Sequence, residues 1–175
     1  MPKKATKKEI QEIKSLFLKH YKNAKTELIY KNDYELLIAV MLSAQCTDKR
    51  VNLITPALFK QYPNPKALQN APLDEIKELI KTCSFFNNKA TNLKAMAQVV
   101  CEKFNGEIPL DREILKTLPG VGQKTANVVL IESKEANFIA VDTHVFRVSH
   151  RLGLSNAKTP LQTEEELTKI FVDNL

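Results

Sequence analysis

The run from Leu36 to Leu42 constrains the fold more than any other stretch, because it is apolar on every side. Such a segment has to be buried all round, either as a strand within a sheet or as a helix at the centre of a core. Asn32 and Glu35 precede it with the spacing of a helix capping box. We therefore predict a central buried helix, which the polar string Ser43–Asp48 ends.

Apolar residues recur at helical spacing along most of the remaining chain. Thr6-x-x-Glu9 and Thr163-x-x-Glu166 are typical capping boxes and predict the starts of the first and last helices. Asp111 is the expected N-cap of a short helix reaching Leu118, and Asn105-Gly106 the expected C-cap pair of the helix before it. Pro56 is expected to break or kink another helix. Each predicted helix has an apolar face with this spacing. The faces consist of Ile10, Ile13 and Phe17; Val51, Ile54 and Leu58; Leu73, Ile76 and Ile80; Leu93, Met96 and Val100; and Leu167 and Ile170. Since no Asn-Gly pair separates two alternating segments, the predicted fold class is all-α.

Composition narrows the class of protein. The chain has 175 residues, 43% of them hydrophobic, which is enough for one domain or two small ones with a buried core. No stretch approaches the roughly 18 apolar residues of a membrane span, and the start lacks an apolar signal core, so we expect a cytoplasmic protein. The net charge of +6 favours a polyanionic partner. Cys46, Cys83 and Cys101 are too few and too far apart for a disulfide framework or a metal knuckle, and no metal site is expected.

Two of the four glycines lie two residues apart, in the segment Leu118–Ala126. A helix that ends near Leu118, a Pro-Gly-x-Gly turn and a new helix from about Val121 predict a helix-hairpin-helix. Backbone N–H groups at the start of the second helix, beside glycines without side chains, favour binding of a phosphate. The alternative is an ordinary helix connection in which the glycines only permit positive φ.

Three strings resemble the endonuclease III family of DNA base-excision repair glycosylases. They are LPGVGQKTANVVL (Leu118–Leu130), AVDTHVFR (Ala140–Arg147) and LSAQCTD (Leu42–Asp48), and the similarity runs in register from about residue 30 to the end. The resemblance implies a six-helix barrel at residues 27–136, with the helix-hairpin-helix near 111–132. It also implies a second helical domain made from residues 1–26 and 137–175, with a cleft between the two.

The resemblance further implies a bifunctional N-glycosylase and AP lyase that removes oxidised pyrimidines. Lys124 would attack C1′ of a flipped nucleotide, Asp142 would assist, and β-elimination through a Schiff base would cut the strand 3′ to the abasic site. The amine must be neutral to attack, and both the first turn of a helix and partial burial would favour that form. Without the resemblance, Lys124 is an ordinary surface lysine and Asp142 an N-cap.

DNA contacts are expected from the hairpin and from three further places. The resemblance assigns Gln45 to the hole left by the flipped base, with a plain loop amide as the alternative. Phe85 aligns with a second inserted residue that is often leucine, and it could instead belong to the core. His144 and Arg147 are expected phosphate contacts or structural residues. The hairpin residues expected to contact DNA are Leu118, Gly120, Val121, Gly122 and Thr125.

Members of this family usually continue into a segment whose four cysteines hold a 4Fe-4S cluster, and this sequence stops before that segment. No residue of this chain is therefore expected to bind a cofactor. We expect either a fragment of a longer protein, which we favour, or a natural cluster-free variant. The expected partner is double-stranded DNA with a damaged base or an abasic site, bound by a monomer. The alternatives are a monofunctional glycosylase of the same superfamily and a noncatalytic DNA-binding fragment.

Overall fold

The computed structural model describes residues 4–22, 24–134 and 136–172, and all the regular elements in these ranges are helices, with no strand. The predicted all-α class is confirmed. The chain divides into two compact units, one made of Glu27–Lys134 and the other of Met1–Thr26 with Glu135–Leu175. Within the described ranges, no helix has the length and apolar character needed to cross a membrane.

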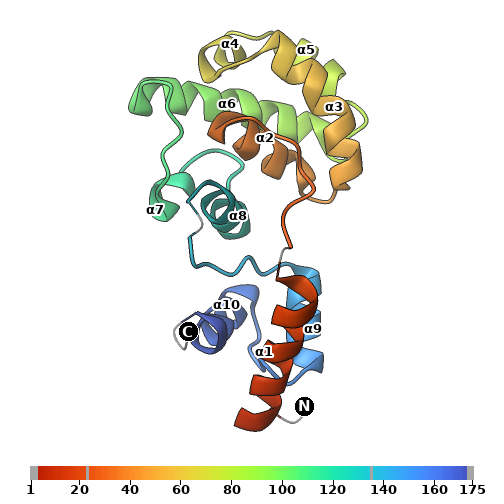
Figure 1. The fold of residues 1–175 in the computed structure, drawn as a ribbon. Helices are drawn as coiled ribbons and strands as arrows, with labels where there is room; N and C mark the ends of the chain where they lie inside the picture. Colours follow the sequence, from red (N-terminus) through yellow and green to blue (C-terminus); the bar gives the residue numbers. More distant parts are fainter. Residues whose placement is uncertain (1–3, 23, 135, 173–175) are drawn as a thin grey trace. The chain divides into compact units, whose positions relative to one another are not determined.

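The unit Glu27–Lys134 is built around α2 (Asp33–Ser43), as the apolar run predicts. Every side chain from Leu36 to Leu42 is buried, and α2 packs against α3, α6 and α8 (Figure 1). The surrounding helices are α3 (Asp48–Gln61), α4 (Pro65–Gln69), α5 (Leu73–Ile80), α6 (Phe86–Phe104), α7 (Arg112–Leu115) and α8 (Gln123–Lys134). α4 was not among the predicted helices, although Asn64-Pro65 is a typical helix start.

The capping residues in front of α2 form only half of the predicted box. Asn32 accepts a hydrogen bond from the backbone N–H of Glu35 at 2.9 Å. The Glu35 carboxylate accepts from the N–H of Lys31 at 2.8 Å, one residue before the position that a capping box would use. Both contacts satisfy backbone donors next to a fully buried helix, which stabilises its start.

The unit Met1–Thr26 with Glu135–Leu175 contains α1 (Lys7–Tyr21), α9 (Thr143–Arg151) and α10 (Pro160–Phe171). The predicted capping box at Thr6 and Glu9 is present. Its small core consists of three buried side chains and the half-buried apolar residues around them. These are Val141, Leu154 and Leu167, with Ile10, Ile13, Ile139, Val145, Phe146, Ile170 and Phe171.

Of the two outcomes expected at Pro56, a break is excluded, because α3 continues through this residue to Gln61. One expectation about a helix end is wrong. The last helix begins after Thr159, whose hydroxyl accepts from the N–H of Gln162, and not after Thr163. Pro160 suits the first helical position, and Thr163 is buried one turn inside, where its hydroxyl donates to the Thr159 carbonyl at 3.0 Å. The predicted caps at Asp111 and at Asn105-Gly106 are present.

Candidate DNA interface and active site

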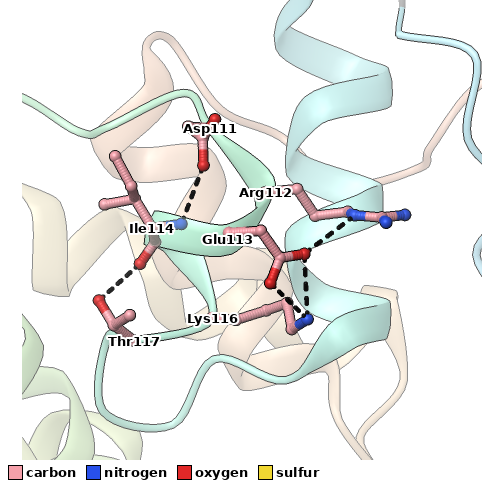
Figure 2. Close-up of polar contacts among 6 residues, drawn as sticks. All are labelled: Asp111, Arg112, Glu113, Ile114, Lys116 and Thr117. Atoms are coloured by element: carbon pink, nitrogen blue, oxygen red, sulfur yellow. Dashed lines mark hydrogen bonds and ion pairs between the residues drawn. The ribbon is translucent and has the colours of Figure 1, made fainter.

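The first helix of the hairpin is a single turn that side chains hold in place (Figure 2). Asp111 Oδ1 accepts from the N–H of Ile114 at 3.0 Å, and the Thr117 hydroxyl donates to the Ile114 carbonyl at 2.7 Å. Lys116 and Arg112 both approach the Glu113 carboxylate, at 3.0 Å and 3.6 Å. These contacts satisfy the ends of a helix too short to be stable by itself, and so define where the following turn begins.

The turn itself is anchored by two apolar side chains. Leu118 is 2% and Val121 6% exposed, and the N–H of Val121 donates to the Leu118 carbonyl at 3.1 Å. Both side chains are buried within the fold, and the Val121 N–H is already hydrogen-bonded. Of the five hairpin residues expected to contact DNA, Leu118 and Val121 therefore position the turn.

The two glycines of the turn differ in their surroundings. Gly120 has φ +77°, and a methyl group there would lie 2.8 Å from Cβ of Asn92 and 3.0 Å from Cε of Met41. A methyl group at Gly122 would meet no atom within 4 Å. Gly120 is therefore required by the fold, whereas Gly122 leaves open space on the outer side of the turn.

Lys124 lies in the first turn of α8, as predicted, and its side chain is exposed. The first ladder bond of α8 runs from the N–H of Ala126 to the Gly122 carbonyl at 3.0 Å. The residues before Ala126 form the positive end of the helix. Gly122 and the half-buried Thr125 flank the same end, so the turn combines an open approach, the positive end of a helix and a primary amine.

The far end of α8 is tied to the start of α2. The Ser133 hydroxyl donates to Asp33 at 2.7 Å, and the Tyr30 hydroxyl donates to Glu132 at 3.4 Å. Burial and the neighbouring Glu132 carboxylate raise the pKa of Tyr30 above its ordinary value of 10.0, which keeps this hydroxyl a donor at neutral pH. These bonds hold the helix that carries Lys124 against the central helix.

Two loops of the same unit hold the residues expected to enter the DNA stack. Gln45 is exposed with φ 54°, and Phe85 is 64% exposed with φ 58°. Left-handed backbone at a residue other than glycine costs about 1 kcal/mol and is found preferentially at ligand-binding positions. The structure rules out a core position for Phe85. Lys89, which sequence reasoning did not single out, joins these two loops through hydrogen bonds from its ammonium group to Leu42 and Ala44 carbonyls.

Asp142 belongs to the other unit, where it is the N-cap of α9. Its Oδ1 accepts from the N–H groups of His144 and Val145, both at 2.9 Å. Arg147 lies 3.3 Å from Nδ1 of His144, and both side chains are exposed, while Val145 faces the small core. Asp142 therefore has the capping role given as its alternative, and the cap fixes the orientation of its carboxylate at the start of the helix that carries His144 and Arg147.

The sequence of this chain is similar to that of known DNA repair proteins. Residues 38–172 match the model for the HhH-GPD superfamily base excision DNA repair proteins. Endonuclease III of Synechocystis sp. is 46% identical over 171 residues, covering 97% of this chain and 78% of that protein. The chain belongs to the endonuclease III family. Endonuclease III of Haemophilus influenzae is 48% identical over 145 residues, which cover 83% of this chain and 69% of that protein.

Solved structures of endonuclease III agree with this assignment. A non-covalent endonuclease III–DNA complex has a TM-score of 0.91 and 43% identity over 95% of this chain and 78% of its own. A trapped endonuclease III–DNA covalent intermediate has a TM-score of 0.92 at the same identity, over 95% of this chain and 79% of its own. The predicted family is confirmed.

The iron-sulfur cluster expected in longer endonuclease III proteins does not fit the residues present. A 4Fe-4S cluster requires four thiolates, and this sequence has three cysteines. Over the described ranges, no three His, Cys, Asp or Glu side chains gather where they could hold a metal ion. Burial raises the pKa of both Cys83 and Cys101, which disfavours the thiolate form that a metal needs.

Proposed function

We propose that this chain is a bifunctional DNA glycosylase and AP lyase of base excision repair that acts on oxidised pyrimidines in duplex DNA. The observation that carries the proposal is the exposed primary amine of Lys124 beside the open Gly122 turn, at the N-terminus of α8. A phosphate held by the turn would bring the sugar of a flipped nucleotide to this amine. Family membership and the covalent complex formed by endonuclease III support the same chemistry.

In the proposed reaction the neutral amine of Lys124 bonds to C1′ as the bond from C1′ to the base breaks. The base leaves with the electron pair of that bond and takes up a proton. Loss of a proton from nitrogen and opening of the sugar ring, with protonation of O4′, leave an iminium between lysine and sugar. Removal of a C2′ proton then expels the 3′ phosphate, and water releases Lys124.

Asp142 is the proposed carboxylate partner in this reaction. Its negative charge would stabilise the positive charge that develops on the sugar as the base departs, and the carboxylate would accept a proton. The cap keeps the side chain in a single orientation, which lowers the entropy cost of that role. His144 and Arg147 are proposed phosphate contacts of the same helix.

The test is borohydride trapping on a duplex with one abasic site. We expect a covalent protein–DNA adduct with the wild-type chain and none with Lys124→Ala or Lys124→Gln. Lys134→Gln is the matched control, because it removes an exposed lysine at the other end of α8 and should leave trapping intact. Circular dichroism checks that each variant is folded.

Two outcomes would contradict the proposal. A folded wild-type chain that binds the duplex without being trapped is a noncatalytic DNA-binding protein. Base release without trapping identifies a monofunctional glycosylase in which water attacks C1′. A second duplex containing 5,6-dihydroxy-5,6-dihydrothymine, an oxidised pyrimidine, tests the substrate class, since the proposal expects its excision in preference to an alkylated purine.

A further inference from the structure

Lys89 links the start of α6 to the end of α2. Its backbone N–H donates to the Phe85 carbonyl at 3.1 Å, which places it one turn after that exposed ring. Its ammonium group donates to the carbonyls of Leu42 at 2.8 Å and Ala44 at 2.6 Å. The half-buried Lys89 therefore connects two loops. Its side chain contacts the residues just before Gln45, and its backbone is hydrogen-bonded to Phe85.

These contacts take the place of an ordinary helix C-cap. The last carbonyls of a helix lie outside its ladder and carry the negative end of the helix dipole, so a cation placed there is favourable. Helices commonly leave this position through a glycine with positive φ. Here α2 ends at Ser43 and the left-handed residue is Gln45, with φ 54°. The lysine contacts offset the backbone cost of presenting a glutamine there.

A buried thiol completes the cluster. The Cys83 side chain lies 3.2 Å from the Lys89 ammonium group and donates to the Leu42 carbonyl at 3.3 Å. Burial raises the pKa of this thiol, an effect that the hydrogen bond to Lys89 partly opposes, while a hydrogen bond with Cys46 raises it further. At neutral pH Cys83 is thus a neutral group, and Lys89 is held by carbonyl oxygens.

We propose that Lys89 is a positioning residue for DNA distortion, which holds Gln45 and Phe85 in the arrangement needed to fill the space left by an extruded nucleotide. The inference rests on the proposed function. Two side chains that enter the stack together have to be ordered together. If their loops are already ordered in the free protein, less conformational entropy is lost when DNA binds. Lys89 acts through the loops and touches no reacting atom.

The experiment measures selectivity for distorted DNA. The probe is a duplex with a tetrahydrofuran abasic analogue opposite 2-aminopurine, whose fluorescence rises when the base is unstacked, compared with an undamaged duplex of the same length. For Lys89→Met we expect about a tenfold loss of preference for the abasic-analogue duplex and a smaller fluorescence rise, with unchanged affinity for the undamaged duplex. Lys89→Gln, which keeps an N–H donor, should lose less.

Lys94→Met is the matched control. Lys94 is also half buried on α6 and also donates to a backbone carbonyl, that of Ala71 at 2.7 Å, outside the two loops. We expect it to change thermal stability about as much as Lys89→Met while leaving selectivity intact. Equal selectivity losses in the two variants would make the effect one of charge or general stability and would overturn the proposal.

A double-mutant comparison tests whether Lys89 acts through the loops. In a Gln45→Ala, Phe85→Ala background, Lys89→Met should cause no further loss of selectivity. A further tenfold loss would overturn the inference, as would wild-type selectivity in both Lys89 variants or unfolding of both while Lys94→Met stays folded. Borohydride trapping by the wild-type chain is measured in parallel, so failure of the proposed function is seen separately from failure of this inference.

Discussion

At the scale of single residues, the two glycines of the hairpin turn should respond in opposite ways to the same substitution. Gly120→Ala places a methyl group 2.8 Å from Asn92 and strains a backbone with φ +77°, so we expect a loss of about 1–3 kcal/mol in the free energy of unfolding. Gly122→Ala meets no neighbouring atom and should stay within about 0.5 kcal/mol of the wild type. Urea denaturation measures both.

Although Gly122→Ala should leave the stability unchanged, we expect it to weaken DNA binding. Its added methyl group would occupy the space through which a phosphate reaches the backbone, so we expect weaker binding of an abasic duplex, measured by fluorescence anisotropy at constant salt. Unchanged affinity in Gly122→Ala would show that DNA does not approach this side of the turn.

Asp142 allows its structural and chemical roles to be separated. Asp142→Asn keeps an oxygen that can cap α9, whereas Asp142→Ala loses the cap and about 1 kcal/mol of stability. Both remove the carboxylate, so both should slow single-turnover base excision by about 100-fold or more. If Asp142→Asn excises bases at the wild-type rate, the cap is the whole role of this residue.

At the scale of elements, α10 should confer a pH dependence on its unit. Glu166 holds the loop before this helix by accepting from the N–H of Asn156 at 3.1 Å. The hydrogen bond from Ser155, with smaller contributions from the Asn156 N–H and the Lys4 charge, lowers the pKa of Glu166 below its ordinary value of 4.5, although burial opposes this. Because the folded pKa is the lower one, the stabilisation is present above the ordinary pKa and is lost as the pH falls through the folded value.

Glu166→Gln removes this contribution. We expect a melting temperature about 2–4 °C below that of the wild type near neutral pH, with a difference that shrinks as the pH falls from the ordinary pKa of 4.5 through the lower folded pKa. Glu165→Gln, an exposed neighbour on the same helix, is the control. Thermal melts followed by circular dichroism across this range would contradict the prediction if the difference between Glu166→Gln and the wild type stayed constant.

At the scale of the whole molecule, the net charge of +6 predicts strongly salt-dependent DNA binding. If roughly four phosphates are neutralised, a fourfold rise in salt concentration should weaken binding about a hundredfold through counterion release. Anisotropy titrations on undamaged duplex at several salt concentrations give the slope directly. A slope near zero would contradict a phosphate-binding surface.

Local sequence was enough to predict the framework of the fold. The apolar run of α2 can be satisfied only by burial on every side, and Thr6, Asp111 and Asn105-Gly106 stop or start helices through contacts within a few residues. The hairpin was likewise readable from its glycines. Caps and turns are formed by residues a few positions apart in the sequence, so they can be predicted without knowing how distant parts of the chain pack.

Tertiary structure alone decided the features that depend on distant residues. Gly120 differs from Gly122 because Asn92 and Met41 approach only one of them, and only the structure showed that Phe85 is exposed and not part of the core. Thr159 rather than Thr163 caps the last helix because the latter packs inside. The contact of Lys89 with the end of α2 joins residues more than forty positions apart. Sequence spacing specifies hydrogen bonds within a turn, whereas contacts between elements exist only once packing has brought them together.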